Sequence, residues 1–243
     1  MTSSSPLLAL DTSTSTARVA LLSATGECLL AREKTAARHS ANLLGLCDEI
    51  LRGVGVAVGD LGAIACGAGP GSFTGLRVGL AVAKGLALPA GLPMVLVSSL
   101  EALACDLAAK SPGAQLVLPC IDAGKGQIYA RIYRAVAGAL PCAQGETDWV
   151  LDPVELCRLA LDAAARESMV MGGTGVDRYI DVFRSGFSAS SVLEAMPGPS
   201  AIAVGRLARA RIERGDFDDI ETAVPRYGRP PDITRPKKPL LTP

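Results

Sequence analysis

The fold of this chain is decided by one stretch, residues 63–79, which reads AIACGAGPGSFTGLRVG. Its first four residues are apolar and predict a short buried strand, and the apolar spacing after Phe73 predicts a helix that runs to residue 88. Between them, Gly67, Gly69 and Gly71 allow a tight turn or a close backbone approach that other residues would block. A strand, a glycine turn and a helix in this order are typical of α/β proteins.

The same alternation of strands and helices continues on both sides of that stretch. Short apolar runs predict strands at 7–10, 19–22, 28–32, 94–97, 116–121, 127–133 and 169–171. Helical periodicity and capping residues predict helices at 40–53, 99–110 and 200–214, and one that begins at residue 153. Asp11 and Asp122 each end a strand and open a hairpin, which indicates an internal duplication. The sequence therefore predicts an α/β fold with two similar lobes.

The predicted lobes are residues 1–105 and 106–224, with part of 200–224 returning to the first lobe. Residues 225–243 contain six Pro and five basic residues, which predicts an extended tail rather than a packed one. These basic residues can contact RNA or a partner, or stay solvated: Arg226, Arg229, Arg235, Lys237 and Lys238. A solvated helix face is predicted for four further arginines: Arg206, Arg209, Arg211 and Arg214.

Composition excludes several classes of protein. The 24 Lys and Arg residues balance 24 Asp and Glu residues, whereas a stand-alone nucleic-acid binder usually carries a basic excess. Seven scattered cysteines form no CxxC pair, and a single histidine allows no HExxH motif, so zinc and iron–sulfur motifs are absent. Residues 1–6 have no basic leader, and Lys84 interrupts the longest apolar run, so we expect a cytoplasmic chain that contacts no membrane.

The glycine turn at 67–75 leaves two interpretations open. Backbone N–H groups between a strand and a helix can bind an anion or a nucleotide phosphate. However, the GxGxxG template fails because Thr74 stands where its third glycine belongs, and there is no GxxxxGK[ST]. The GxSxG template fails as well, because Pro70 lies two residues before Ser72. A purely structural turn is the other interpretation.

Three other features each have a functional and a structural interpretation. Gly75, Gly79 and Ala83 form a smooth stripe on the predicted helix, suited either to a contact within the chain or to a subunit interface. Asp11 and its hydroxyl-rich turn can hold a metal–phosphate group, or the carboxylate can be satisfied by N–H groups of the turn. His39, just before a helix, suits a general base or a structural role.

Residues 69–79, GPGSFTGLRVG, resemble the signature of the TsaB family, also called YeaZ. The segments LDTS at 10–13, VSSL at 97–100, IDA at 121–123 and PRY at 225–227 follow in the family's order, so the resemblance covers nearly the whole chain. It implies the duplicated, ribonuclease H-like fold of the actin, Hsp70 and sugar-kinase superfamily. The family also carries an old glycoprotease-like label.

The resemblance implies an accessory role in tRNA modification. Members of the family are non-catalytic subunits of the bacterial complex that installs N6-threonylcarbamoyladenosine (t6A) at position 37 of tRNAs decoding ANN codons. They bind and stabilise the paralogous transferase subunit TsaD, and the small ATPase TsaE joins them. The resemblance further implies contact with tRNA only through the complex, a homodimer when alone, no metal, and no cofactor beyond weak ATP or ADP binding.

The resemblance also implies which residues bind partners. The expected partner interface, on helices of the first lobe, comprises Leu43, Leu46, Gly75, Arg77, Gly79 and Ala83. On this view Gly79→Leu disrupts the heterodimer while the chain stays folded. The expected vestigial nucleotide cleft comprises Asp11, Thr12, Ser13, Gly69, Pro70, Gly71, Ser72, Phe73, Thr74, Asp122, Gly172 and Gly173.

No catalytic residue is expected, for two reasons. Ser13 stands where the first phosphate hairpin of the superfamily usually has glycine, and one histidine cannot supply the HxxxH metal ligands of the transferase paralogue. Two enzymatic alternatives remain. One is an ATP-dependent phosphotransferase or ATPase that uses Asp11 and the glycine turns. The other is a glycoprotease-type hydrolase that uses Ser72 or His39.

Overall fold

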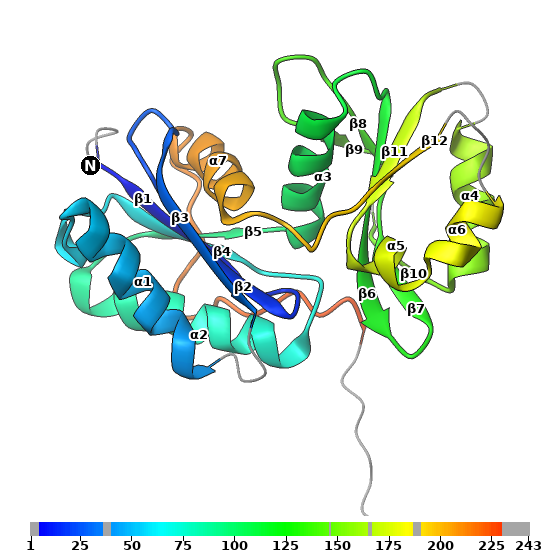
Figure 1. Cartoon of the computed structure of the whole chain (residues 1–243). Helices are drawn as coiled ribbons and strands as arrows, with labels where there is room; N and C mark the ends of the chain where they lie inside the picture. The colour runs from blue at the N-terminus through cyan, green and yellow to red at the C-terminus, as the bar shows by residue number, and fades with distance from the viewer. Residues whose placement is uncertain (1–4, 36–39, 146, 165–166, 187–190, 230–243) are drawn as a thin grey trace, which may run out of the picture.

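Two β-sheets, each with helices packed on it, make up the protein (Figure 1). The computed structural model describes residues 5–35, 40–145, 147–164, 167–186 and 191–229. His39 and the tail residues Arg235, Lys237 and Lys238 lie outside these ranges, so their predicted roles stay predictions.

The first sheet has the strand order β3-β2-β1-β4-β5. Its strands are β1 (Leu7–Asp11), β2 (Thr16–Leu22), β3 (Cys28–Thr35), β4 (Ala63–Gly67) and β5 (Met94–Val97). Leu8 and Leu10 of β1 face α1 (Ser40–Val54) and α2 (Phe73–Ala90), whereas Leu7 and Ala9 face α7 (Ala201–Ile212). Because helices cover both faces, β1 and β4 are buried throughout, as expected from their continuous apolar runs.

The second sheet has the strand order β10-β7-β6-β11-β12, and β8 joins β6 to β9. Its strands are β6 (Leu116–Gly124), β7 (Gln127–Ala130), β8 (Tyr133–Arg134), β9 (Cys142–Ala143), β10 (Trp149–Leu151), β11 (Met169–Gly172) and β12 (Ser191–Glu194). The helices on this sheet are α3 (Ser99–Lys110) on one face and α4 (Pro153–Ala163), α5 (Thr174–Arg178) and α6 (Ile180–Gly186) on the other. A 3-10 turn, η1 (Val58–Asp60), precedes β4.

The two sheets repeat one topology. β1 pairs antiparallel with β2 and parallel with β4, and β6 pairs antiparallel with β7 and parallel with β11. Asp11 ends β1, and Asp122 occupies the matching place near the end of β6. This repeat is the duplicated ribonuclease H-like arrangement, so the predicted two-lobed α/β fold is confirmed.

The helix α3 lies between the two sheets. It is continuous from Ser99 to Lys110, and it packs on β6 and β11 and against α7. The predicted lobe boundary at residue 105 is therefore wrong, because it would cut this helix. The chain leaves the first sheet before α3, and α7 returns to pack on β1 and β2.

The arginines of α7 are not a uniformly solvated face, contrary to the prediction. Arg206 and Arg214 are exposed, but Arg209 is only 9% exposed and donates to the Ser23 carbonyl oxygen at 2.7 Å. Burial lowers the pKa of Arg209. Arg211 is half-buried and donates to Asp218 Oδ2 at 3.0 Å.

Among the described residues, α2 is long and apolar enough to cross a membrane by length and composition alone, with a mean hydropathy of 1.2 over 18 residues. Lys84 interrupts the apolar run, but α2 still meets this length and composition criterion. Core helices have the same composition, and α2 packs on β1 and β4.

Candidate functional site: the cleft between the two hairpins

A cleft of about 730 Å³ separates the β1–β2 turn from the β6–β7 hairpin. In α/β proteins, ligands bind beyond the carboxyl ends of parallel strands, and this cleft lies beyond the ends of β1 and β6. Its lining includes Ser13, Thr14, Ser15, Gly71, Ser72, Phe73, Asp122, Gly124, Thr174, Arg178, Tyr227 and Arg229. Hydroxyl groups from the first lobe thus face two arginines across the cleft, a combination suited to a phosphate-bearing ligand.

Asp11 does not line this cleft. Its carboxylate is completely buried and accepts from Ser13 N at 2.9 Å, Ser13 Oγ at 2.7 Å and Ser99 Oγ at 2.9 Å. Burial raises the pKa of Asp11, although these hydrogen bonds oppose the shift. The structure therefore agrees with a carboxylate satisfied within the turn and not with one that reaches a metal–phosphate group.

The signature loop packs directly onto the first hairpin. Ser72 N donates to the Ser13 carbonyl oxygen at 2.7 Å, and Thr12 Oγ1 donates to the Gly75 carbonyl oxygen at 2.8 Å. A Cβ atom at Gly71 or Gly75 would collide with the backbone of Ser13 or Thr12. Glycine is therefore required because two backbones touch here, which favours the structural interpretation of the turn.

One amide in the first turn of α2 is also engaged within the chain. Ser72 is the N-cap of α2, and its Oγ accepts from Gly75 N at 3.2 Å. Thr74 lies exposed in the first turn, while Pro70 is buried in the loop. The signature thus braces the helix against the hairpin.

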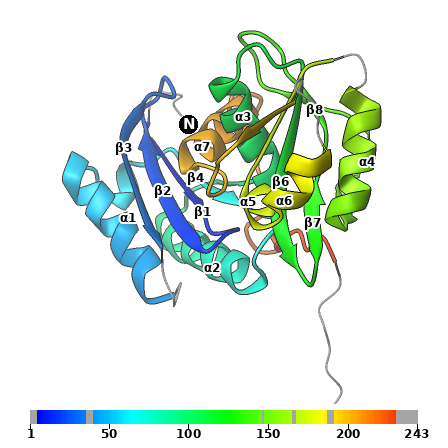
Figure 2. The ribbon, with the colours of Figure 1, turned by 45° about the vertical axis from the view of Figure 1, so that its right-hand side comes forward.

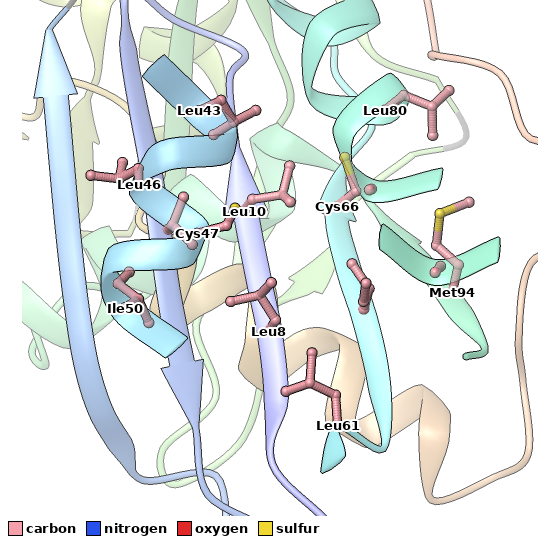
Figure 3. Close-up of a cluster of buried hydrophobic side chains, with 14 of the residues drawn as sticks. Leu8, Leu10, Leu43, Leu46, Cys47, Ile50, Leu61, Cys66, Leu80 and Met94 are labelled. Carbon is pink, nitrogen blue, oxygen red and sulfur yellow. The ribbon is translucent and has the colours of Figure 1, made fainter. Parts of the chain in front are cut away.

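The small-residue stripe of α2 faces inward. Gly75, Gly79 and Ala83 are buried, and a Cβ atom at Gly79 would collide with Thr12 Oγ1. Leu43 and Leu46 of α1 are buried in the same core as Leu8 and Leu10 (Figure 3). The prediction that these five residues touch a partner is wrong, because they are buried against the chain's own first lobe. Of that set, only Arg77 is exposed.

Gly79→Leu was predicted to disrupt the heterodimer while the chain stays folded, but the structure indicates a different effect. The larger side chain would collide with the first hairpin and destabilise the fold. It therefore cannot report on a heterodimer.

Asp122 stands at the second hairpin and faces the cleft. Its Oδ2 accepts from Arg178 NH1 at 2.8 Å, and its backbone N donates to Thr174 Oγ1 at 3.1 Å. Neither Thr174 nor Arg178 was identified from the sequence, because their only signal is proximity created by α5.

Gly172 and Gly173 are not among the residues that line the cleft. A Cβ atom at Gly172 would approach the Glu194 carbonyl oxygen to 2.6 Å, and one at Gly173 would collide with the Cys120 carbonyl oxygen. Their role is close packing between β11 and its neighbours. Their assignment to the cleft wall is wrong, and Thr174 holds that place.

The first residues of the tail are packed, contrary to the prediction. Arg226 N donates to the Ala68 carbonyl oxygen at 2.7 Å. Tyr227 accepts from Arg77 Nε at 2.7 Å, and its ring centroid lies 4.9 Å from that of Phe73. Of residues 225–229, Tyr227 and Arg229 therefore belong to the wall of the cleft.

Within the part of the chain that the structure describes, no group of three or more His, Cys, Asp or Glu residues is placed to hold a metal ion. The polar and aromatic groups that line the cleft are hydroxyl groups, arginines, aromatic rings and the Asp122 carboxylate.

Comparison with known proteins gives this architecture a family. A family model described as "TsaD: tRNA N6-adenosine threonylcarbamoyltransferase" matches residues 31–182. The tRNA threonylcarbamoyladenosine biosynthesis protein TsaB of Escherichia coli (strain K12) is 39% identical over 176 residues, which are 72% of this chain and 74% of that protein. The chain belongs to the TsaB family. The family predicted from residues 69–79 is thereby confirmed.

Other TsaB relatives agree in sequence and in structure. The protein of that name from Haemophilus influenzae is 43% identical over 123 residues, 51% of each chain. YeaZ from Pseudomonas aeruginosa superposes with a TM-score of 0.77 at 35% identity, covering 92% of this chain and 99% of that one. The similarity to this TsaB-family structure therefore spans both lobes.

Proposed function

We propose that this chain is a non-catalytic accessory subunit for t6A biosynthesis in tRNA, acting in the cytoplasm by binding and stabilising a TsaD-type transferase. Its TsaB relatives are named for threonylcarbamoyladenosine biosynthesis. One observation carries the non-catalytic part: Asp11 is buried with three donors on it, and the signature loop fills the space beside its hairpin. A phosphotransferase that used Asp11 would need this carboxylate within reach of its substrate.

The partner surface that fits this role is the outer face of α1 and α2. The two helices pack against each other and lie side by side in both views (Figures 1 and 2). Leu44 and Leu88 are 54% and 55% exposed, and Ala81 and Gly85 also face outward. Exposed apolar residues on neighbouring helices are typical of a protein interface. We assign this face to the transferase, or to a second copy of this chain when the transferase is absent.

Substitutions on the outer face test this assignment. Leu44→Arg and Gly85→Arg should abolish co-elution with the transferase in size-exclusion chromatography, and the melting temperature should not fall because both positions are exposed. Gly85 suits the test because a Cβ atom there meets nothing within 4 Å. Leu161→Arg, at an exposed leucine of α4 in the second lobe, is the matched control. Normal complex formation by both α1–α2 variants would overturn the assignment.

Threonine incorporation into unmodified tRNA tests the function itself. The assay contains labelled threonine, bicarbonate, ATP, the synthase that makes threonylcarbamoyl-adenylate, the transferase and TsaE, with or without this chain. Incorporation should require this chain, and it should be absent when the transferase is omitted. Incorporation without this chain would contradict the proposal, and magnesium-dependent ATP turnover by the pure chain, lost in Asp11→Ala, would favour the phosphotransferase alternative.

A further inference from the structure

Residues 225–229, here called the strap, first contact the first lobe. Arg226 N bonds to the Ala68 carbonyl oxygen at 2.7 Å, next to the signature loop. Arg77 Cζ lies 3.9 Å from the centroid of the Phe73 ring and 5.7 Å from that of Tyr227, and its Nε donates to Tyr227 Oη. The strap is therefore joined to the loop after β4 by a backbone hydrogen bond and to the N-terminal part of α2 by aromatic and cation–π contacts.

Two residues later the strap contacts the second lobe. Gly228 lies so close to the Tyr129 ring that a Cβ atom there would collide with it. Arg229 NH1 donates to Gln127 Oε1 at 3.3 Å, and both partners in the second lobe belong to β7. Within five residues the chain thus passes from one lobe to the other.

The strap lies opposite the other connections between the lobes. Both views show α3 and α7 in the upper part of the molecule and the strap lower down, beside β6 (Figures 1 and 2). On the α3–α7 side, Arg18 of β2 contacts the segment that leads from β12 back to α7. Its NH2 donates to the Pro197 carbonyl oxygen at 3.2 Å. On the side of the strap, Tyr227 and Arg229 are part of the wall of the cleft.

We propose that the strap is an interlobe clasp, which fixes the angle between the two lobes and closes the free edge of the cleft. Its contacts are superficial: Phe73 and Tyr227 remain 40% and 37% exposed. Releasing the strap therefore uncovers little of either core, so the lobes can change their angle about the α3–α7 side while each stays folded.

The protein carries a natural pair of labelling sites for the test. Cys28 on β3 and Cys142 on β9 are exposed, and they lie in different lobes. Burial raises the pKa of the half-buried Cys105 to about 12, so nitroxide reagents should label the two exposed thiols first. Pulsed electron paramagnetic resonance then reports the Cys28–Cys142 distance distribution in the full chain.

The expected result is one narrow distribution for the unaltered protein. Tyr227→Ala and deletion of residues 225–243 should broaden it and add longer distances, whereas deletion of residues 230–243 should leave it narrow. Gly228→Val, which displaces the strap from Tyr129, should broaden it as well, and this variant decides the question if the longer deletion does not fold. Unchanged distributions in Tyr227→Ala and Gly228→Val would overturn the clasp. Equal broadening in both deletions would overturn its assignment to residues 225–229.

Discussion

At the scale of single residues, Asp11 and the glycines around it show how the first hairpin is closed. Ser99 Oγ donates to Asp11 and accepts from Gly69 N at 3.2 Å, so one hydroxyl joins the hairpin to the signature loop. A Cβ atom at Gly67 would collide with Asp11 Oδ2. The Asp11 carboxylate thus belongs to a buried hydrogen-bond network, in which Ser99 connects it to the signature loop.

Asp11 should make stability depend on pH in a defined direction. Burial raises the pKa of folded Asp11 above 3.8. The stability that protonated Asp11 contributes is therefore fully present below the pKa of the unfolded chain, and it is lost as pH rises through the pKa of the folded protein. Asp11→Asn does not titrate. The free energy of unfolding of the unaltered protein minus that of Asp11→Asn should therefore fall as pH rises across this window, by at most about 1.4 kcal/mol per pH unit. Urea unfolding at stepped pH measures it, and a difference that grows with pH would contradict the prediction.

Two glycines of α2 should respond in opposite ways to the same substitution. Gly79→Ala should destabilise by about 1–3 kcal/mol, because the new methyl group collides with the buried Thr12 side chain. Gly85→Ala should stabilise by up to about 1 kcal/mol, because the site is open and alanine favours helix. Urea unfolding of both variants measures this pair, and equal effects would show that Gly79 is not sterically confined.

At the scale of elements, the edge strand β5 is protected by the segment after α7. Asp218 N donates to the Met94 carbonyl oxygen at 2.9 Å, and Leu96 N donates to Asp218 Oδ2 at 2.7 Å. Arg211 NH1 donates to the Leu96 carbonyl oxygen at 2.8 Å. Unpaired strand edges invite pairing with other chains, and these bonds cover this one.

Removing the Asp218 side chain should therefore lower the free energy of unfolding more than removing the Asp216 side chain. Asp218→Ala leaves Leu96 N–H without its acceptor, and we expect a loss of about 1–3 kcal/mol. Asp216→Ala removes only an ion pair whose Asp216 side is exposed, so it should lower the free energy of unfolding less than Asp218→Ala does. Thermal and urea denaturation compare the two, and a larger loss for Asp216→Ala would refute this account of the edge.

At the scale of the whole molecule, burial divides the seven cysteines into unequal groups. Burial raises the pKa of Cys47 to about 12 and that of Cys157 to about 11, and it raises the pKa of Cys66 and Cys120 as well. Thiolates react and thiols do not, so these positions should be inert in the folded protein.

A titration with a thiol reagent should distinguish the exposed cysteines from the buried ones. In native buffer at mildly alkaline pH, the reagent should rapidly modify Cys28 and Cys142, and in urea it should modify all seven cysteines. Mass spectrometry of the early product identifies the sites. Rapid modification of Cys47 or Cys66 would mean that the first core opens readily.

The sequence alone was enough for the family and for the order of most strands and helices, because these depend on local patterns. Apolar runs that end at Asp11 and Asp122 marked both hairpins, and the apolar spacing after Phe73 marked α2. The eleven residues at 69–79 identified the family on their own.

Tertiary structure alone decided which surfaces these elements bury. The stripe of Gly75 and Gly79 suited a partner or a sheet equally well, and only the contact with Thr12, 63 residues away in the chain, settled it. Arg77 meets Tyr227 across 150 residues, and no local pattern encodes such a pair. Sequence periodicity determines that a helix has an apolar face. Whether a sheet of the same chain or a partner protein packs on that face depends on how distant segments come together in space.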